Sequence, residues 1–244
     1  MLNILFIPEI ILSIGVMIII LFDLFFQKQK GFSFALVQFL LLLAAYYSLN
    51  NKFSPNYSAY TLDEFTNVFK FILLLGSLTI FHYTYKHLKF LKILKIEYFT
   101  ISLLGLIGTM IMISANSLLM LYLGIELLSL SLYALIGFNK KSSLSSEAAI
   151  KYYVLGAMSS GILLFGISLI YGFTGSITYD DIASQLINID MNSVDYIAII
   201  FGIIFITASL CFKFVAAPFH MWVPHIYQVL LISTTILLSQ LPPI

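Results

Sequence analysis

The sequence predicts an all-α polytopic membrane protein with about seven complete transmembrane helices, a partial eighth and a broken seventh helix. Three observations predict this class. Of the 244 residues, 61% are apolar and 9% are charged, whereas an ordinary soluble domain has roughly 25% charged residues. The apolar residues come in blocks of about 20, the length that crosses a hydrocarbon core about 30 Å thick. Each block must be helical, because lipid offers the backbone no hydrogen-bond partners.

Eight apolar blocks follow one another along the chain. Seven are expected at residues 8–26, 32–49, 65–85, 98–114, 117–138, 148–173 and 194–222, and the eighth begins near residue 226. Residues 174–193 carry aspartates among isoleucines and leucines. This pattern indicates an external loop that we interpret as a plain connector, with one amphipathic helix as the alternative.

The seventh block is too long for a straight membrane span. Residues 194–222 would form a helix about 43 Å long at 1.5 Å per residue. Pro218 lies inside the block, and proline removes a helix hydrogen bond and clashes with the preceding turn. We therefore expect the seventh helix to break near Pro218.

Lysines in alternate loops predict the orientation. They follow the first, third and fifth blocks, as Lys28, Lys30, Lys86, Lys89, Lys92, Lys95, Lys140 and Lys141. Positive loops face the cytoplasm or the matrix, which places the N-terminus on the opposite side. All 12 basic residues are lysine, a bias typical of AT-rich organelle genomes, so we expect the mitochondrial inner membrane with the N-terminus in the intermembrane space.

Composition also argues against several classes of site. A net charge of +1 gives no basic surface for nucleic acid. The single Cys211 cannot ligate an iron–sulfur cluster or a structural zinc, which need several thiolates. No glycine-rich dinucleotide fingerprint follows a predicted strand. We expect no redox centre, cofactor site or metal site in this chain.

Glu126 is a candidate functional residue because it lies near the middle of the fifth block. A charge at that depth is costly and commonly marks an ion or proton path. Tyr122, Ser129 and Tyr133 share its helix face. The alternative is that these hydroxyls satisfy the carboxyl group and merely fix helix packing.

Lys151, Lys213 and His220 are the other candidates. Lys151 either extends its amine to the membrane surface or points inward toward Glu126, since the fifth and sixth helices should be antiparallel neighbours. Gly156 and Ser160 would allow those helices to approach closely. Lys213 and His220 flank the expected break, as charges do along ion pathways, although a proline kink with a satisfied histidine is the alternative reading.

Lys70, Glu9 and Asp23 are weaker candidates. Each lies within one or two turns of an expected helix end. Extension to the interface or helix capping explains them, so we expect structural roles.

Three runs of sequence resemble chain 2 of proton-pumping NADH:quinone oxidoreductase, respiratory complex I. Residues 124–136 read GIELLSLSLYALI, residues 149–175 read AIKYYVLGAMSSGILLFGISLIYGFTG, and residues 212–222 read FKFVAAPFHMW. They occur in the order typical of that family. The resemblance extends from about residue 63 to residue 228.

The resemblance implies a proton-translocating membrane-arm subunit of the enzyme. It implies three N-terminal transmembrane helices in residues 1–96 and a five-helix antiporter-like unit in residues 97–244. It pairs Glu126 with Lys151, makes Lys213 a proton carrier, and makes His220 its relay. NADH, FMN, iron–sulfur clusters and ubiquinone would be bound by other subunits, and the partners would be membrane-arm subunits and lipid.

The chain departs from the family pattern near its C-terminus. His225, Val229, Leu231 and Pro243 stand where that pattern has aspartate, glycine, proline and lysine. Family members run to about 14 helices, so the resemblance suggests a split gene whose second half is a separate chain. The alternatives are a structural subunit that no longer pumps and a stand-alone cation/proton antiporter subunit.

Overall fold

The computed structural model describes residues 6–25, 29–50, 59–140, 142–187, 194–219, 223–227 and 234–237. The described helices are α1 (Ile7–Phe25), α2 (Lys30–Asn50), α3 (Glu64–Phe90), α4 (Glu97–Ile113), α5 (Leu118–Ile136), α6 (Ser143–Thr174), α7 (Tyr179–Ile187), α8 (Val194–Lys213) and α9 (Val223–Tyr227). Six of them, α1, α2, α3, α5, α6 and α8, are long and apolar enough to cross a membrane, and α4 is a shorter apolar helix. The all-α membrane fold expected from the sequence is confirmed. Of the eighth span, the structure describes only α9 and the short helical segment 234–237.

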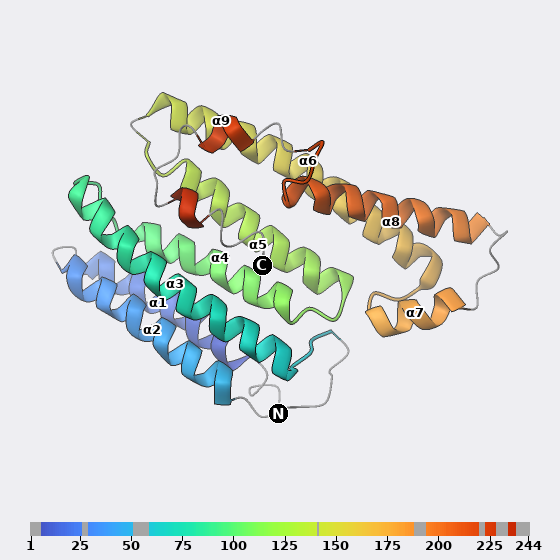
Figure 1. The fold of residues 1–244 in the computed structure, drawn as a ribbon, viewed down its shortest axis with the longest axis horizontal. Coiled ribbons are helices and arrows are strands. Elements are labelled where there is room, and N and C mark those ends of the chain that lie inside the picture. The colour runs from blue at the N-terminus through green and yellow to red at the C-terminus, as the bar shows by residue number, and fades with distance from the viewer. Residues whose placement is uncertain are drawn as a thin grey trace.

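The helices form two groups (Figure 1). The first contains α1 to α5, in which α1 packs on α2 and α4, α2 on α3, and α4 on α5. The second is the pair α6 and α8, which packs on the first group mainly through α5 and α6. Half of the residues in the apolar stretch of α5 are buried, against 22% in α8. Therefore α5 is a central helix, whereas α8 leaves a large apolar face exposed.

Backbone contact between two glycines holds α6 against α8. A Cβ atom on Gly166 would lie 2.7 Å from the carbonyl oxygen of Gly202. Ser159 on α6 and Ser209 on α8 are buried nearby, and the Ser209 hydroxyl donates to the Ser159 carbonyl at 2.7 Å. Small residues let membrane helices approach in this way.

The lysine-bearing connections lie at one end of the bundle, as the sequence predicted. Lys30 Nζ donates to the carbonyl of Leu94 at 2.8 Å, which joins the connection before α2 to the one before α4. Lys95 Nζ lies 6.0 Å from the ring centre of Phe138, at the connection after α5. The arrangement therefore gathers the lysines from three connections at the same end.

The connections at the opposite end pair through their backbones. Isolated antiparallel bridges join Tyr60 to Ala115 and Ser117 to Thr178. The segment between the sixth and seventh spans contains the helix α7, so the favoured reading of a plain connector is wrong and the alternative of one helix holds.

The seventh span is broken, but the break comes before the predicted proline. α8 ends at Lys213, five residues before Pro218. Val215 has φ of 60°, and the Ala216 amide donates to the Cys211 carbonyl at 2.9 Å. This is the hydrogen-bond pattern of a Schellman motif, which ends a helix through one left-handed residue, usually glycine. A main-chain reversal at Val215 thus ends α8.

Candidate functional site

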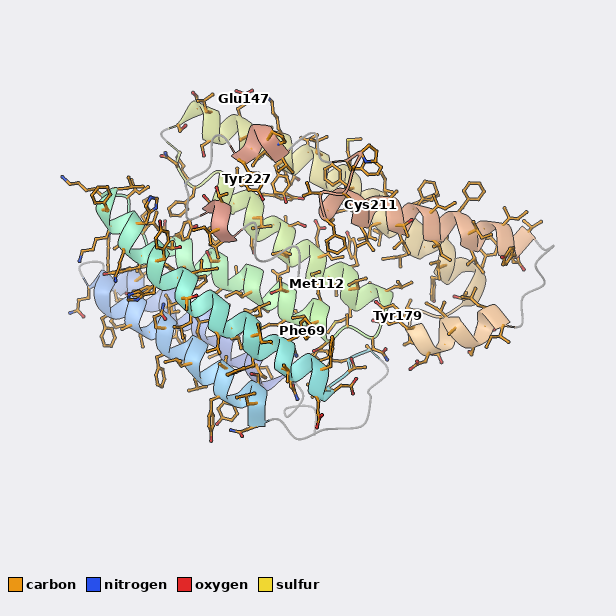
Figure 2. All side chains as sticks on the ribbon, viewed as in Figure 1. Phe69, Met112, Glu147, Tyr179, Cys211 and Tyr227 are labelled. Atoms are coloured by element: carbon orange, nitrogen blue, oxygen red, sulfur yellow. The ribbon has the colours of Figure 1, made fainter. Side chains whose placement is uncertain are left out.

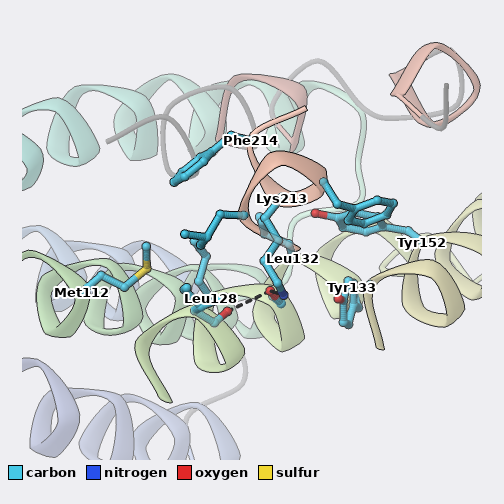
Figure 3. A pocket seen from close by; sticks show the side chains of 12 residues that line it. Met112, Leu128, Leu132, Tyr133, Tyr152, Lys213 and Phe214 are labelled. Atoms are coloured by element: carbon cyan, nitrogen blue, oxygen red, sulfur yellow. Dashed lines mark hydrogen bonds between the residues drawn. The ribbon is translucent and has the colours of Figure 1, made fainter. Parts of the chain in front are cut away.

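Lys213 is placed by the end of α8. It is the last helical residue, so its side chain leaves the helix where the backbone reverses. Its Nζ atom donates to Ser129 Oγ on α5 and to Ser160 Oγ on α6, each at 3.0 Å. Figure 3 shows Lys213 reaching onto α5 beside Leu132, with Tyr133 and Tyr152 on one side and Met112 on the other. One amine therefore contacts two helices of the bundle.

Glu126 belongs to the same hydrogen-bond network. It lies in the third turn of α5, whose first turn is capped by the Ser117 hydroxyl, the acceptor of the Met120 amide. The hydroxyl of Ser160 donates to Glu126 Oε2 at 2.7 Å. Ser160 is buried, with 4% of its surface exposed. Its single hydroxyl thus connects Lys213 with Glu126.

The polar stripe predicted on α5 is formed only in part. Ser129 faces Lys213 and donates its own hydroxyl to the Ile125 carbonyl at 2.8 Å. Tyr133 packs edge-on against Tyr152 of α6, with ring centres 4.8 Å apart. Glu126 instead accepts a hydrogen bond from the Ser160 hydroxyl on α6, a contact that the polar stripe on α5 did not predict.

A small cavity lies beside this network. It is bounded by α5, α6 and the end of α8, and Lys213, Ser129 and Tyr152 line it together with apolar side chains. Gly156 keeps α6 close to α5 here, since a Cβ atom on Gly156 would overlap Tyr133 Oη. The sequence predicted that Gly156 allows α5 and α6 to approach closely, and the structure confirms this contact.

The expected pair between Glu126 and Lys151 is not formed in the structure. Lys151 is exposed, and its Nζ lies 2.6 Å from Oε1 of Glu147, one turn earlier on α6. Glu147 lies at the outer edge of the bundle in Figure 2. Nine residues separate Lys151 from Ser160, which is about 2.5 helical turns. Because Ser160 faces Glu126, Lys151 points to the opposite side of α6.

The predicted relay residue His220 lies outside the described residues. Of the weaker candidates, Asp23 is partly exposed in the last turn of α1, as expected for a residue near a helix end. Glu9 and Lys70 differ from the expectation. Neither extends to the interface: both are buried, and Lys70 Nζ lies 2.6 Å from Glu9 Oε1.

The sequence did not identify Ser160 as a polar contact. From the sequence, Ser160 is a small residue four positions after Gly156, on the face of α6 expected to approach α5. A serine on such a face could have been read as a hydrogen-bond donor to Glu126. No three His, Cys, Asp or Glu side chains gather as a metal site within the described ranges.

Comparison with known proteins identifies the family. Residues 115–243, which include Glu126, Ser160 and Lys213, match the transmembrane family described as NADH:quinone oxidoreductase/Mrp antiporter. The chain belongs to this family. The matched residues therefore include the three side chains that form the network.

Relatives named NADH-quinone oxidoreductase subunit N match almost the whole chain. The protein from Ruthia magnifica is 40% identical over 242 residues, which are 97% of this chain and 50% of the relative. The protein from Pelagibacter ubique is 38% identical over 225 residues, 91% of this chain and 46% of the relative. The chain thus spans about half the length of the curated relatives it matches.

Solved structures of the same fold come from respiratory membrane complexes. A chain of respiratory complex I from Thermus thermophilus has a TM-score of 0.75 at 24% identity and matches 95% of this chain and 49% of its own length. A chain of the archaeal membrane-bound sulfane sulfur reductase has a TM-score of 0.78 at 22% identity, covering 91% of this chain and 47% of that one. At these identities the matches show a shared fold.

Proposed function

We propose that this chain is a membrane-arm subunit of a proton-translocating NADH:quinone oxidoreductase. In this proposal Lys213 and Glu126 exchange a proton through Ser160. The observation that carries the proposal is the position of the Ser160 hydroxyl, which accepts from Lys213 Nζ at 3.0 Å and donates to Glu126 Oε2 at 2.7 Å. Both distances are within hydrogen-bond reach, as proton transfer requires.

In this transfer two protons move, each along one hydrogen bond. The Lys213 ammonium gives a proton to Ser160 Oγ, while the hydroxyl proton of Ser160 passes to Glu126 Oε2. The products are a neutral amine, a neutral carboxylic acid and an intact serine, so net charge is conserved. Ser129 accepts a second hydrogen bond from the amine and keeps Nζ in place. The reverse transfer restores the charged state.

The assignment to an NADH:quinone oxidoreductase rests on the relatives named subunit N. In the proposal, other membrane-arm subunits and lipid surround this chain, and other subunits bind NADH, FMN, iron–sulfur clusters and ubiquinone. The proposal concerns only the part of the proton path that lies in this half of the relatives' length. The use of lysine for all 12 basic residues supports a location in the mitochondrial inner membrane, and the lysines in alternate connections support an N-terminus in the intermembrane space.

Lys151 and His220 have different places in this proposal. Lys151 is bonded to Glu147, so its predicted pairing with Glu126 would require α6 to rotate by about half a turn. We call the chain of Lys213, Ser160 and Glu126 the relay. In the proposal, Lys151 influences the relay only in a second conformation of α6. His220 remains the predicted relay beyond Lys213.

Replacement of the carrier tests the proposal. Lys213→Met removes the transferable proton and keeps an unbranched side chain, so proton translocation per NADH oxidised should fall in the assembled complex. Lys95→Met is the matched control. The Lys95 side chain is 60% exposed, and its ion pair with the exposed Glu97 carboxylate is long, at 4.0 Å. An unchanged proton-to-electron ratio in Lys213→Met would contradict the proposal.

A stand-alone cation/proton antiporter is the second candidate, since the matching family also includes Mrp antiporters. Sodium-driven proton flux in vesicles without NADH dehydrogenase activity would favour it. Proton movement that occurs only during NADH oxidation would favour the oxidoreductase subunit. A subunit that no longer pumps would show neither flux, although it would still be required for assembly.

A further inference from the structure

A second group of ionisable side chains is buried outside the network of Lys213. Glu9 comes from α1, Lys70 from α3, and Tyr60 from the segment that precedes α3. The side chains of Lys70 and Glu9 are 1% and 6% exposed, and Nζ lies 2.6 Å from Oε1. The Tyr60 hydroxyl donates to the same oxygen at 2.8 Å. We call these three residues the anchor cluster.

Stability alone gives a weak account of the anchor cluster. Removing two charges from water costs several kcal/mol per ion, and replacing a buried ion pair with apolar residues is often neutral or stabilising. Charges inside a membrane protein more often mark a functional position. The question is which part of the molecule the cluster controls.

Tyr60 links the cluster to the rest of the chain. Burial, followed by the nearby Glu9 carboxylate, raises the pKa of Tyr60 above its usual value, so its hydroxyl stays protonated and remains a donor. Its ring packs on Phe6, with ring centres 4.2 Å apart. The side chain of Tyr60 is therefore fixed at both its ring and its hydroxyl.

The backbone around Tyr60 holds the turn between α4 and α5. The Thr61 amide donates to the Ser114 carbonyl at 3.0 Å, and the Asn116 amide donates to the Ala59 carbonyl at 3.0 Å. These two bonds flank the bridge between Tyr60 and Ala115. A displacement of Tyr60 would be transmitted directly to residues 114–116.

The same turn is bonded on its other side to the segment after α6. The Leu118 amide donates to the Ile177 carbonyl at 3.0 Å, and the Tyr179 amide donates to the Asn116 carbonyl at 3.2 Å. Residues 59–61, 114–118 and 177–179 thus form one ladder at this end of the bundle. The ladder joins the start of α5, which carries Glu126, to the end of α6, which carries Ser160.

We propose that Glu9 and Lys70, acting through Tyr60, are positioning residues that fix the start of α5 and hence the contact between Glu126 and Ser160. The proposal rests on the function proposed above, because that contact is the suggested proton path. A hydrogen bond of 2.7 Å tolerates little displacement, and a misplacement of about 1 Å can lower a reaction rate about 100-fold. The anchor cluster thus acts on the relay without touching it.

Amide hydrogen exchange in the assembled membrane complex tests the positioning step. Glu9→Gln and Tyr60→Phe each remove part of the anchor cluster with little change of shape. Exchange at the amides of Asn116 and Leu118 should rise about tenfold in both variants, the effect of losing a hydrogen bond worth about 1.4 kcal/mol. Lys95→Met, which disrupts an exposed pair, should leave both amides unchanged.

Proton translocation supplies the readout that a purely structural role would not move. Glu9→Gln should lower the proton-to-electron ratio, and the exchanged pair Glu9→Lys with Lys70→Glu should restore it together with slow exchange. Unchanged exchange at Asn116 and Leu118 in Tyr60→Phe and Glu9→Gln would overturn the proposal. Faster exchange with an unchanged ratio would also overturn it.

The two proposals fail separately. If Lys213→Met still pumps, the proton path is wrong, whereas the exchange measurement still decides whether the anchor cluster holds α5. If Lys213→Met stops pumping without faster exchange at residues 116 and 118, the proton path stands, and the anchor-cluster variants alone decide the positioning role.

Discussion

Two regions of this molecule place a lysine near a glutamate and a hydroxyl beside both, and they differ in whether the ammonium group also touches the carboxylate. In the anchor cluster, Lys70 Nζ contacts Glu9 directly at 2.6 Å. In the relay, the Ser160 hydroxyl stands between Lys213 Nζ and Glu126. Lys213 is also less buried than Lys70.

The difference indicates what each pair can do. A direct ion pair is held by both charges, and moving a proton from one partner to the other removes the attraction that holds it. A pair joined through a hydroxyl can transfer a proton while each side chain keeps its hydrogen bond to the serine. The comparison therefore assigns positioning to Glu9 with Lys70 and transfer to Glu126 with Lys213.

The largest stability loss should follow from breaking the direct pair. Lys70→Met leaves the Glu9 carboxylate buried without its cation, which should destabilise the protein by about 3–5 kcal/mol. Adding Glu9→Gln removes the stranded charge and should recover most of that loss. Denaturant titration of the single and double variants in detergent measures both, and equal losses in the two would contradict direct pairing.

A smaller loss is expected where α5 meets α6. Gly156→Ala places a methyl group against Tyr133 Oη, and such overpacking costs about 1–3 kcal/mol. Because Gly156 lies one turn before Ser160, the variant should also lower proton translocation. Gly161→Ala is the matched control on the same helix, since nothing lies within 4 Å of its added Cβ. Equal thermal stability of the two variants would show that α5 and α6 pack less closely at Gly156 than the structure shows.

The smallest stability effect should come from the exposed pair on α6. Lys151→Gln removes a bond to Glu147 between side chains that are 48% and 53% exposed, and exposed pairs four residues apart contribute about 0.3–0.5 kcal/mol. Thermal unfolding should hardly change. If Lys151 pairs with Glu126 in a second conformation, proton translocation falls although stability is retained, and an unchanged translocation rate would remove Lys151 from the path.

Much of the fold follows from local sequence. Block length and apolar content predicted the spans, whereas the aspartates among apolar residues favoured a plain connector where the structure has α7. The end of α8 was harder, because the sequence shows a proline at residue 218 whereas the helix ends through a left-handed valine at residue 215. Valine is a poor marker for that conformation, which favours glycine.

The sequence predicted which single residues form the site, but not which of them contact one another. Charge at membrane depth identified Glu126 and Lys213. It could not show that the Ser160 face of α6, and not the opposite face with Lys151, meets Glu126, since the facing side of α6 is set by its contacts with both α5 and α8. For the same reason Glu9 and Lys70, 61 residues apart in sequence, were each read as residues near a helix end, whereas the folded chain makes them partners.

The most direct test of the account is proton translocation in Ser160→Ala compared with Ser159→Ala. Both serines are buried on α6, but Ser159 bonds Ser209 on α8 whereas Ser160 joins Lys213 to Glu126. The account predicts that Ser160→Ala lowers the number of protons moved per NADH oxidised, whereas Ser159→Ala retains it. Equal translocation in the two variants would contradict the relay through Ser160.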